Sequence, residues 1–192
     1  MGVTNIYFVR HAQSDSKVKE DATRPLTAKG TNDAKRVAEM LKDLDIHKIF
    51  SSPYQRTMAT VKDLAEALRQ EIVAVDDFRE RRVGEWVEDF PAFSRQQWTD
   101  FAYKLEDGES LAETQARNIS ALHAVLRDNE GMNLVIGTHG TAMSTVINYY
   151  DPAYGFEQFW GIVGKMPYIL HLQFQGIELL NMEEIEWRSE FV

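Results

Sequence analysis

Cysteine is absent from this sequence, which rules out disulfides, thiolate catalysis and zinc sites built on cysteine. Long apolar runs are absent too, because no stretch approaches the ~20 residues that a membrane span requires. The N-terminus lacks a basic segment followed by a long apolar one, so we expect no secretory signal. These absences favour a cytoplasmic protein.

Positive charge is scarce, since 21 Lys and Arg face 30 Asp and Glu for a net charge of -9. A nucleic-acid-binding face needs the opposite excess, and an anionic membrane surface repels an acidic chain. Nucleic acids and membranes are therefore not expected partners. Any site for an anion must be a local positive pocket in an acidic protein.

The 192 residues have the size of one ordinary domain, and the 44% hydrophobic content is normal for a globular protein. The sequence contains no repeats, low-complexity tracts or Gly/Ser linkers. We therefore expect a single domain over residues 1–192. The oligomeric state stays open, a homo-oligomer included.

Short apolar runs predict strands, and apolar residues at helical spacing predict helices. The expected strands are residues 5–9, 48–50, 72–75, 133–137, 168–174 and 177–180. Helices are expected from the N-cap Thr27 toward Leu44, over 58–68, from the capping box Ser110–Glu113 to Asp128, and over 141–149. This alternation predicts an α/β fold, a three-layer α/β/α sandwich with a mostly parallel central sheet.

The segment 79–108 is the least regular part of the sequence and is rich in aromatic residues, with a short helix expected inside it. Residues 86–108 are expected to be an insertion that acts as a lid and shapes the substrate pocket. The same aromatic side chains would serve equally as plain core around the short helix. The sequence does not decide between these two interpretations.

Polar residues follow three of the expected strands. Arg10-His11 follows the first strand, Ser51–Arg56 the second, and His139-Gly140 the strand at 133–137. In α/β sheets, ligands bind beyond the carboxyl ends of the strands. Arginines bind a dianion and a neutral imidazole attacks it, so the pattern indicates phosphoryl transfer through a phosphohistidine.

Six segments together resemble, in order, the boxes of the histidine phosphatase superfamily, the phosphoglycerate-mutase-like proteins. They begin at Arg10 (RHAQS), Arg24 (RPLTAKG), Ser51 (SSPYQRTMAT), Phe78 (FRERRVGEW), Gly108 (GES) and Thr138 (THG). The resemblance covers nearly the whole chain. Three positions depart from the family pattern: Ala12 replaces a usual Gly, Lys17 stands where many members have an amide, and Trp86-Val87-Glu88 replaces Trp-Glu-Gly.

The resemblance implies a fold of the phosphoglycerate-mutase type and a phosphoric monoester hydrolase without metal or cofactor. His11 would be the nucleophile, His139 would donate to the phosphoryl group, and Glu80 would protonate the leaving oxygen and then help to activate water. Arg10 and Arg56 would grip the phosphoryl oxygens. Further phosphate contacts are expected from Ser14, Lys17, Gly140 and Thr141.

Plainer interpretations exist for several of these residues. Spacing alone favours a surface ion pair between Glu80 and its neighbouring arginines, and the resemblance reverses this preference. The pair Asp76-Asp77 is expected in a turn rather than at a metal. The other histidines are expected to be structural or on the surface: His47, His123 and His171.

The expected activity is hydrolysis of small phosphorylated metabolites. One alternative is phosphoryl transfer of the phosphoglycerate mutase type, which the short stretch after the last expected strands disfavours. A second is a phosphatase for phosphohistidine on proteins, which often lacks an acid corresponding to Glu80. A third is a non-catalytic binding relative, which the presence of both histidines and both arginines disfavours.

Overall fold

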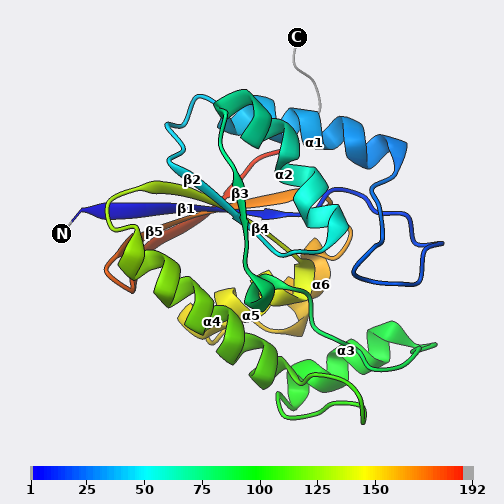
Figure 1. The fold of residues 1–192 in the computed structure, drawn as a ribbon. Coiled ribbons are helices and arrows are strands. Elements are labelled where there is room, and N and C mark those ends of the chain that lie inside the picture. The colour runs from blue at the N-terminus through cyan, green and yellow to red at the C-terminus, as the bar shows by residue number, and fades with distance from the viewer. Residues whose placement is uncertain (1, 188–192) are drawn as a thin grey trace.

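A six-stranded sheet in the order β3-β2-β4-β1-β5-β6 forms the middle layer of the computed structural model, which describes residues 2–187 (Figure 1). β1 pairs in parallel with β4, and β2 pairs in parallel with β4 and β3, whereas β5 and β6 add antiparallel strands. The predicted mostly parallel sheet is confirmed. The strands are β1 (Val3–Arg10), β2 (Lys48–Ser51), β3 (Ile72–Ala74), β4 (Asn133–Thr138), β5 (Tyr168–Gln175) and β6 (Glu178–Ile185).

Helices cover both faces of the sheet and complete the three layers (Figure 1). On one face lie α1 (Ala28–Leu41) and α2 (Gln55–Leu68). On the other lie α4 (Leu111–Asp128), α5 (Gly140–Tyr150) and α6 (Phe156–Ile162). The sequence did not predict α6. The predicted single domain also includes residue 1 and residues 188–192, which lie outside the described part.

Two apolar clusters, one on each face of the sheet, make the core. Successive residues of β1 point to opposite faces, as the pleat of a strand requires. Ile6 and Phe8 therefore join the cluster under α4 and α5, while Tyr7 and Val9 join the cluster under α1 and α2. Both faces of β1 are thus buried, which holds its carboxyl end rigidly in the middle of the sheet.

Local capping signals in the sequence are reproduced in the structure. The hydroxyl of Thr27 accepts from the amide of Gly30, and Ser110 with Glu113 forms both hydrogen bonds of the capping box. The first helix ends at Leu41 rather than near Leu44, because the chain turns away and reaches a positive φ of 51° at Asp45. Asp76 opens a short 3-10 helix (Asp76–Phe78) instead of a plain turn.

Gly30 lets the loop after β1 lie directly on the first turn of α1. A Cβ at this position would come 2.1 Å from the carbonyl oxygen of Gln13, a distance that no side chain tolerates. The loop is also hydrogen-bonded to the N-cap of α1, because the Gln13 carbonyl accepts from the Thr27 amide at 3.0 Å. α1 therefore supports the loop that follows Arg10-His11.

The segment 86–108 contains α3 (Phe90–Thr99), which packs toward α6. Phe93 and Gln97 of this helix are buried, and the ring of Trp98 lies 5.5 Å from that of Phe159. Trp86, by contrast, is 77% exposed. The short helix is confirmed, while the action of the segment as a lid stays a prediction. No helix among residues 2–187 is both long and apolar enough to cross a membrane.

Candidate active site

The register of the central strands brings the three predicted loops together. Arg10 at the end of β1 pairs with Thr138 at the end of β4, and Ser51 at the end of β2 pairs with Gly137. The residues that follow, His11 and His139, consequently face each other with ring centroids 5.4 Å apart. Parallel strands end at one edge of a sheet, so the carboxyl edge is where the site forms.

His11 is 7% exposed and is oriented by its own backbone neighbour. Its Nδ1 lies 2.8 Å from the carbonyl oxygen of Ala12. Because a carbonyl only accepts, Nδ1 carries the proton and Nε2 keeps its lone pair. Burial, with the positive charge of Arg56, lowers the pKa of His11 to about 3. The imidazole is therefore neutral near pH 7 and has a free nucleophilic nitrogen.

His139 is fully buried and lies between Arg56 and Ser52. Nη2 of Arg56 lies 3.0 Å from its Nδ1, and an arginine only donates, so Nδ1 is the acceptor. Nε2 then carries the proton and donates to Oγ of Ser52 at 2.8 Å. Burial and the charge of Arg56 hold the pKa of His139 well below its ordinary value. His139 is thus a neutral donor through Nε2.

Arg10 binds the carboxyl end of α6 with most of its guanidinium group. Nη1 donates to the carbonyls of Ile162 (2.6 Å) and Lys165 (3.0 Å), and Nη2 donates to the carbonyl of Val163 (2.9 Å). A Cβ on Gly140 would come 3.0 Å from Cζ of Arg10, so this glycine allows helix α5 to begin directly against the guanidinium. Arg10 is therefore held from two sides.

Arg56 is 2% exposed at the start of α2 and contacts the loop between β1 and α1. Its Nη1 donates to the carbonyl of Asp21 (2.5 Å) and pairs with Oδ1 of the same residue (3.1 Å). The same carboxylate pairs with Nη1 of Arg24 at 3.3 Å. Asp21 thus links two arginines, and the charges of both lower the pKa of the nearby His11.

The Nε atoms of Arg10 and Arg56 are buried and have no hydrogen-bond partner among residues 2–187. Buried donors without a partner are rare because their lost hydration costs free energy. Here two such donors belong to cations beside a neutral histidine. This combination of charge and free donors is suited to binding an anionic ligand.

Glu80 reaches the amino end of α5 from the irregular segment after the 3-10 helix. Its Oε2 accepts from the amide of Thr141 (3.1 Å), and its Oε1 accepts from those of Ala142 (3.0 Å) and Arg81 (2.8 Å). The first amides of a helix have no partner inside it and favour a negative charge. Glu80 is therefore not a surface ion pair, and the amide of Thr141 serves the carboxylate in this structure.

The remaining predicted phosphate contacts lie on the loop after β1. Ser14 pairs its backbone with Leu26 and is partly buried. Lys17 is exposed, and its amide donates to Oδ1 of Asp15 at 3.0 Å. Two residues on, Nζ of Lys19 lies 5.3 Å from the ring of Trp86, so this loop touches the segment 86–108.

Several residues of the site were not singled out from the sequence. Ser52, Tyr54 and Thr60 lie inside the sequence box around Arg56, and their spacing from Arg56 is the signal that could have identified them. In the structure, the ring centroid of Tyr54 lies 5.1 Å from that of His139, and the hydroxyl of Thr60 accepts from the amide of Ala12. Asp21 and Arg24 come from the loop, where no periodicity marks them.

The other three histidines lie away from this centre. His47 is exposed, His123 lies 3.1 Å from the hydroxyl of Tyr150, and His171 stacks on Tyr7, as structural or surface residues would. Within residues 2–187, no three His, Asp or Glu side chains group so that they could hold a metal ion.

Sequence comparison matches residues 6–179 to the histidine phosphatase superfamily (branch 1). The probable phosphoglycerate mutase GpmB of Enterobacter sp. (strain 638) is 28% identical over 156 residues, which cover 74% of this chain and 73% of that protein. The uncharacterized phosphatase PhoE of Bacillus subtilis (strain 168) is 29% identical over 150 residues, or 76% of each chain.

Solved structures share the fold. A mycobacterial glucosyl-3-phosphoglycerate phosphatase superposes with a TM-score of 0.77 at 18% identity, over 98% of this chain and 100% of that one. A phosphoserine phosphatase from Entamoeba histolytica gives a TM-score of 0.75 at 19% identity, over 93% and 96%. At such identities the likeness concerns the fold alone.

Proposed function

The chain belongs to the histidine phosphatase superfamily (branch 1), and from this premise we propose that it hydrolyses small phosphate monoesters through a phosphohistidine on His11. One observation carries the proposal: a buried, neutral His11 with Nε2 free lies beside the unpartnered Nε donors of Arg10 and Arg56. These are a nucleophile and a dianion site in one place. The charged donors stabilise the transferring phosphoryl group, as a metal does elsewhere.

The first half of the reaction transfers the phosphoryl group to the enzyme. The carboxylate of Glu80 first takes up a proton from solvent. The lone pair of His11 Nε2 then attacks phosphorus, the ester P–O bond breaks, and the leaving oxygen takes that proton from Glu80. In the second half, water attacks phosphorus and gives its proton back to Glu80 while the P–N bond breaks. The products are an alcohol and inorganic phosphate. His139 donates through Nε2 to a phosphoryl oxygen in both halves, and this bond replaces the one that Nε2 makes to Ser52 in the structure.

The first test compares phosphate release by the parent, His11→Ala and His47→Ala. The substrates are p-nitrophenyl phosphate, as a generic aryl phosphate, and phosphoserine and phosphoglycerates, chosen from the names of the relatives. We expect kcat/KM to fall about 1,000-fold or more in His11→Ala, because a lost nucleophile removes the covalent route. The exposed His47 is the matched control and keeps parent activity.

A labelled phosphoenzyme gives an independent readout of the same proposal. Brief incubation with ³²P-labelled substrate should leave alkali-stable, acid-labile label on the parent, as a P–N bond requires, and none on His11→Ala. Phosphate release that survives in His11→Ala would overturn the assignment of the nucleophile.

Phosphoglycerate mutase activity is the second candidate function, and the observation that favours it is the name of several relatives. A mutase returns the phosphoryl group to a phosphoglycerate instead of to water. Incubation with 2-phosphoglycerate and detection of 3-phosphoglycerate separates the two, since a hydrolase yields free phosphate instead. The cytoplasmic location stays a prediction of the sequence.

A further inference from the structure

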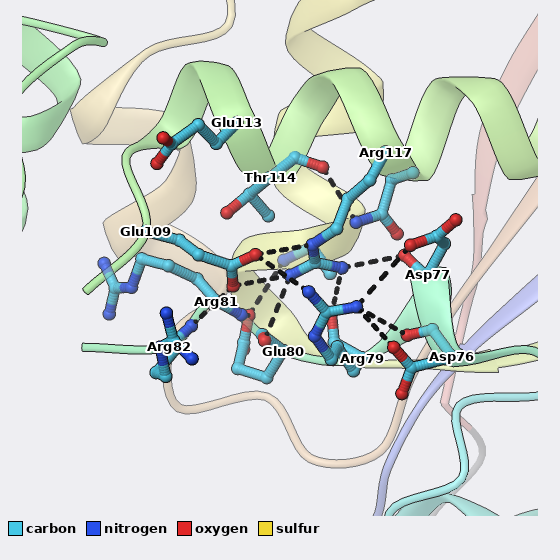
Figure 2. A network of polar contacts seen from close by, with 12 residues as sticks. Asp76, Asp77, Arg79, Glu80, Arg81, Arg82, Glu109, Glu113, Thr114 and Arg117 are labelled. Atoms are coloured by element: carbon cyan, nitrogen blue, oxygen red, sulfur yellow. Dashed lines mark hydrogen bonds and ion pairs between the residues drawn. The ribbon is translucent and has the colours of Figure 1, made fainter. Parts of the chain in front are cut away.

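The guanidinium group of Arg117, on α4, divides its N–H donors between the carboxylate of Glu109 and the backbone at and before Glu80 (Figure 2). Nε and Nη2 donate to the two carboxylate oxygens of Glu109, at 2.9 and 3.0 Å. Nη1 donates to the carbonyls of Asp77 (2.7 Å) and Arg79 (2.8 Å), and Nη2 also reaches the carbonyl of Glu80 (3.1 Å). One side chain therefore fixes three carbonyls at or just before the proposed acid.

Glu109 makes similar contacts to the backbone after Glu80, and we call Arg117 and Glu109 together the clamp. Its Oε2 accepts from the amide of Arg82 (2.9 Å), its Oε1 accepts from Nη2 of Arg79 (3.0 Å), and its own amide donates to the carbonyl of Arg82 (2.7 Å). Burial raises the pKa of Glu109, but the hydrogen bonds from Arg117 and Arg82 outweigh burial and hold it below the ordinary value. The carboxylate is thus ionised near pH 7 and completes the pair with Arg117.

The clamp matters because residues 79–89 form neither helix nor strand. Backbone in a sheet or helix is held by its own hydrogen bonds, whereas the backbone at Glu80 relies on Arg117 and Glu109. At the other end, the carboxylate of Glu80 is held by the amides of Thr141 and Ala142. Helices α4 and α5 therefore grip Glu80 from its two ends.

We propose that Arg117 is a positioning residue for the reaction, and that its clamp on the backbone sets where the carboxyl group of Glu80 meets the leaving oxygen. This inference rests on the proposed function. Arg117 touches neither the phosphoryl group nor the leaving group in this scheme. It acts through Glu80, so replacing Arg117 should cause the same kinetic defect as replacing Glu80, but a smaller one.

Dependence on the leaving group tests the inference. Nitrophenolate departs without a proton, whereas an alkoxide needs one from the acid. In Arg117→Gln we expect kcat/KM to fall about 10- to 100-fold for alkyl phosphates such as phosphoserine, and less than about 3-fold for p-nitrophenyl phosphate. Glu80→Gln should show the same selectivity with larger losses. Arg127→Gln, the same change at an exposed position of α4, should behave as the parent.

A double mutant separates positioning from a general structural defect. Glu80→Gln/Arg117→Gln should lose no more activity on alkyl phosphates than Glu80→Gln alone, because Arg117 acts only through Glu80. Glu109→Gln, which keeps the volume of the side chain, provides a second variant if Arg117→Gln does not fold. The circular dichroism spectrum and the thermal midpoint identify folded variants.

The outcomes separate the two proposals. An equal loss on alkyl and nitrophenyl phosphates, or losses that multiply in the double mutant, would overturn the role of Arg117 and leave the hydrolase intact. A parent enzyme that releases phosphate from no substrate would overturn the proposed function, and the inference would fall with it.

Discussion

Two buried histidines are kept uncharged by the same surroundings. Burial is the larger cause of the lowered pKa at both His11 and His139, and the charge of Arg56 is the next. An imidazole in water is about half protonated near pH 6.5, and its protonated form is no nucleophile. In the proposed mechanism the arginines thus have two effects, since they bind the anion and also keep His11, the proposed nucleophile, in its neutral form.

This arrangement predicts acid sensitivity of the fold. The pKa of His11 falls from 6.5 in the unfolded chain to about 3 in the folded one, so between these values unfolding takes up a proton. The free energy of unfolding therefore decreases as the pH falls below 6.5, by up to about 1.4 kcal/mol per pH unit for each such histidine. Urea titrations at several pH values measure this slope.

His11→Asn isolates the contribution of one histidine. Its slope below pH 6.5 should be shallower than that of the parent by up to about 1.4 kcal/mol per pH unit. The control His47→Asn changes an exposed histidine in the same way. Equal slopes for the parent and His11→Asn would show that His11 is not held neutral by the fold.

Among the helices, those with local signals were predictable and those with tertiary support were not. Thr27 and Ser110 predict the starts of α1 and α4, because an N-cap depends on residues only three positions apart. α6 has seven residues and begins after Gly155, so its apolar residues at helical spacing, Phe156, Phe159 and Trp160, span less than the roughly 11 residues over which a periodicity is recognised. Its carboxyl end is stabilised by Arg10, more than 150 positions earlier in the chain, and no local pattern reveals such a contact.

The same distinction applies to the site. His11, Arg56 and His139 were predictable because each follows a buried strand, and parallel strands end together. Asp21 and Arg117 were not, because a loop and a distant helix supply them and neither position carries a periodic signal. The sequence thus predicted which groups meet at the sheet edge, and the structure adds what holds them in place.

The contact between Arg10 and α6 predicts a large effect on stability. Arg10→Ala removes three hydrogen bonds and leaves the carbonyls of residues 162, 163 and 165 without their donor, so we expect the free energy of unfolding to fall by about 2–4 kcal/mol. Urea denaturation measures it, and faster hydrogen exchange in α6 would locate it. Arg36→Ala removes a partly exposed side chain that pairs loosely with Asp33, at 3.9 Å, and should cost less than about 1 kcal/mol.

If Arg10→Ala and Arg36→Ala have the same free energy of unfolding, the guanidinium of Arg10 does not stabilise the fold, and only its proposed role in phosphate binding remains. A second possible finding, lost stability without faster exchange in α6, would place the effect elsewhere. Either result would contradict the view that Arg10 fastens α6 to the end of β1.

The protein as a whole is acidic, with a net charge of -9, yet the surroundings of His11 are positively charged. Arg10, Arg24 and Arg56 lie around His11, and the carboxylate of Asp21 pairs with Arg24 and Arg56. Buried cations with incomplete partners raise the free energy of the folded state. An anion that completes them should therefore stabilise the whole molecule.

Inorganic phosphate, the product of the proposed reaction, tests this expectation. At a concentration 100 times its Kd it should add about 2.7 kcal/mol to the free energy of unfolding. Thermal unfolding should then shift upward by several degrees, at roughly 2–4 °C per kcal/mol for a domain of this size. Sodium chloride at equal ionic strength should give a smaller shift, and Arg56→Gln should reduce the response to phosphate. An equal shift from chloride would contradict a specific site.

The place of β1 in the sheet has a consequence for synthesis. The two neighbours of β1 are β4 and β5, which span residues 133–138 and 168–175, far later in the chain. A nascent chain that reaches only residue 132 has no partner for either edge of β1, so we expect Arg10 and His11 to stay solvated at that stage. His11 should therefore become buried and lose its proton only after both later strands have been made, which makes the proposed site a late product of folding.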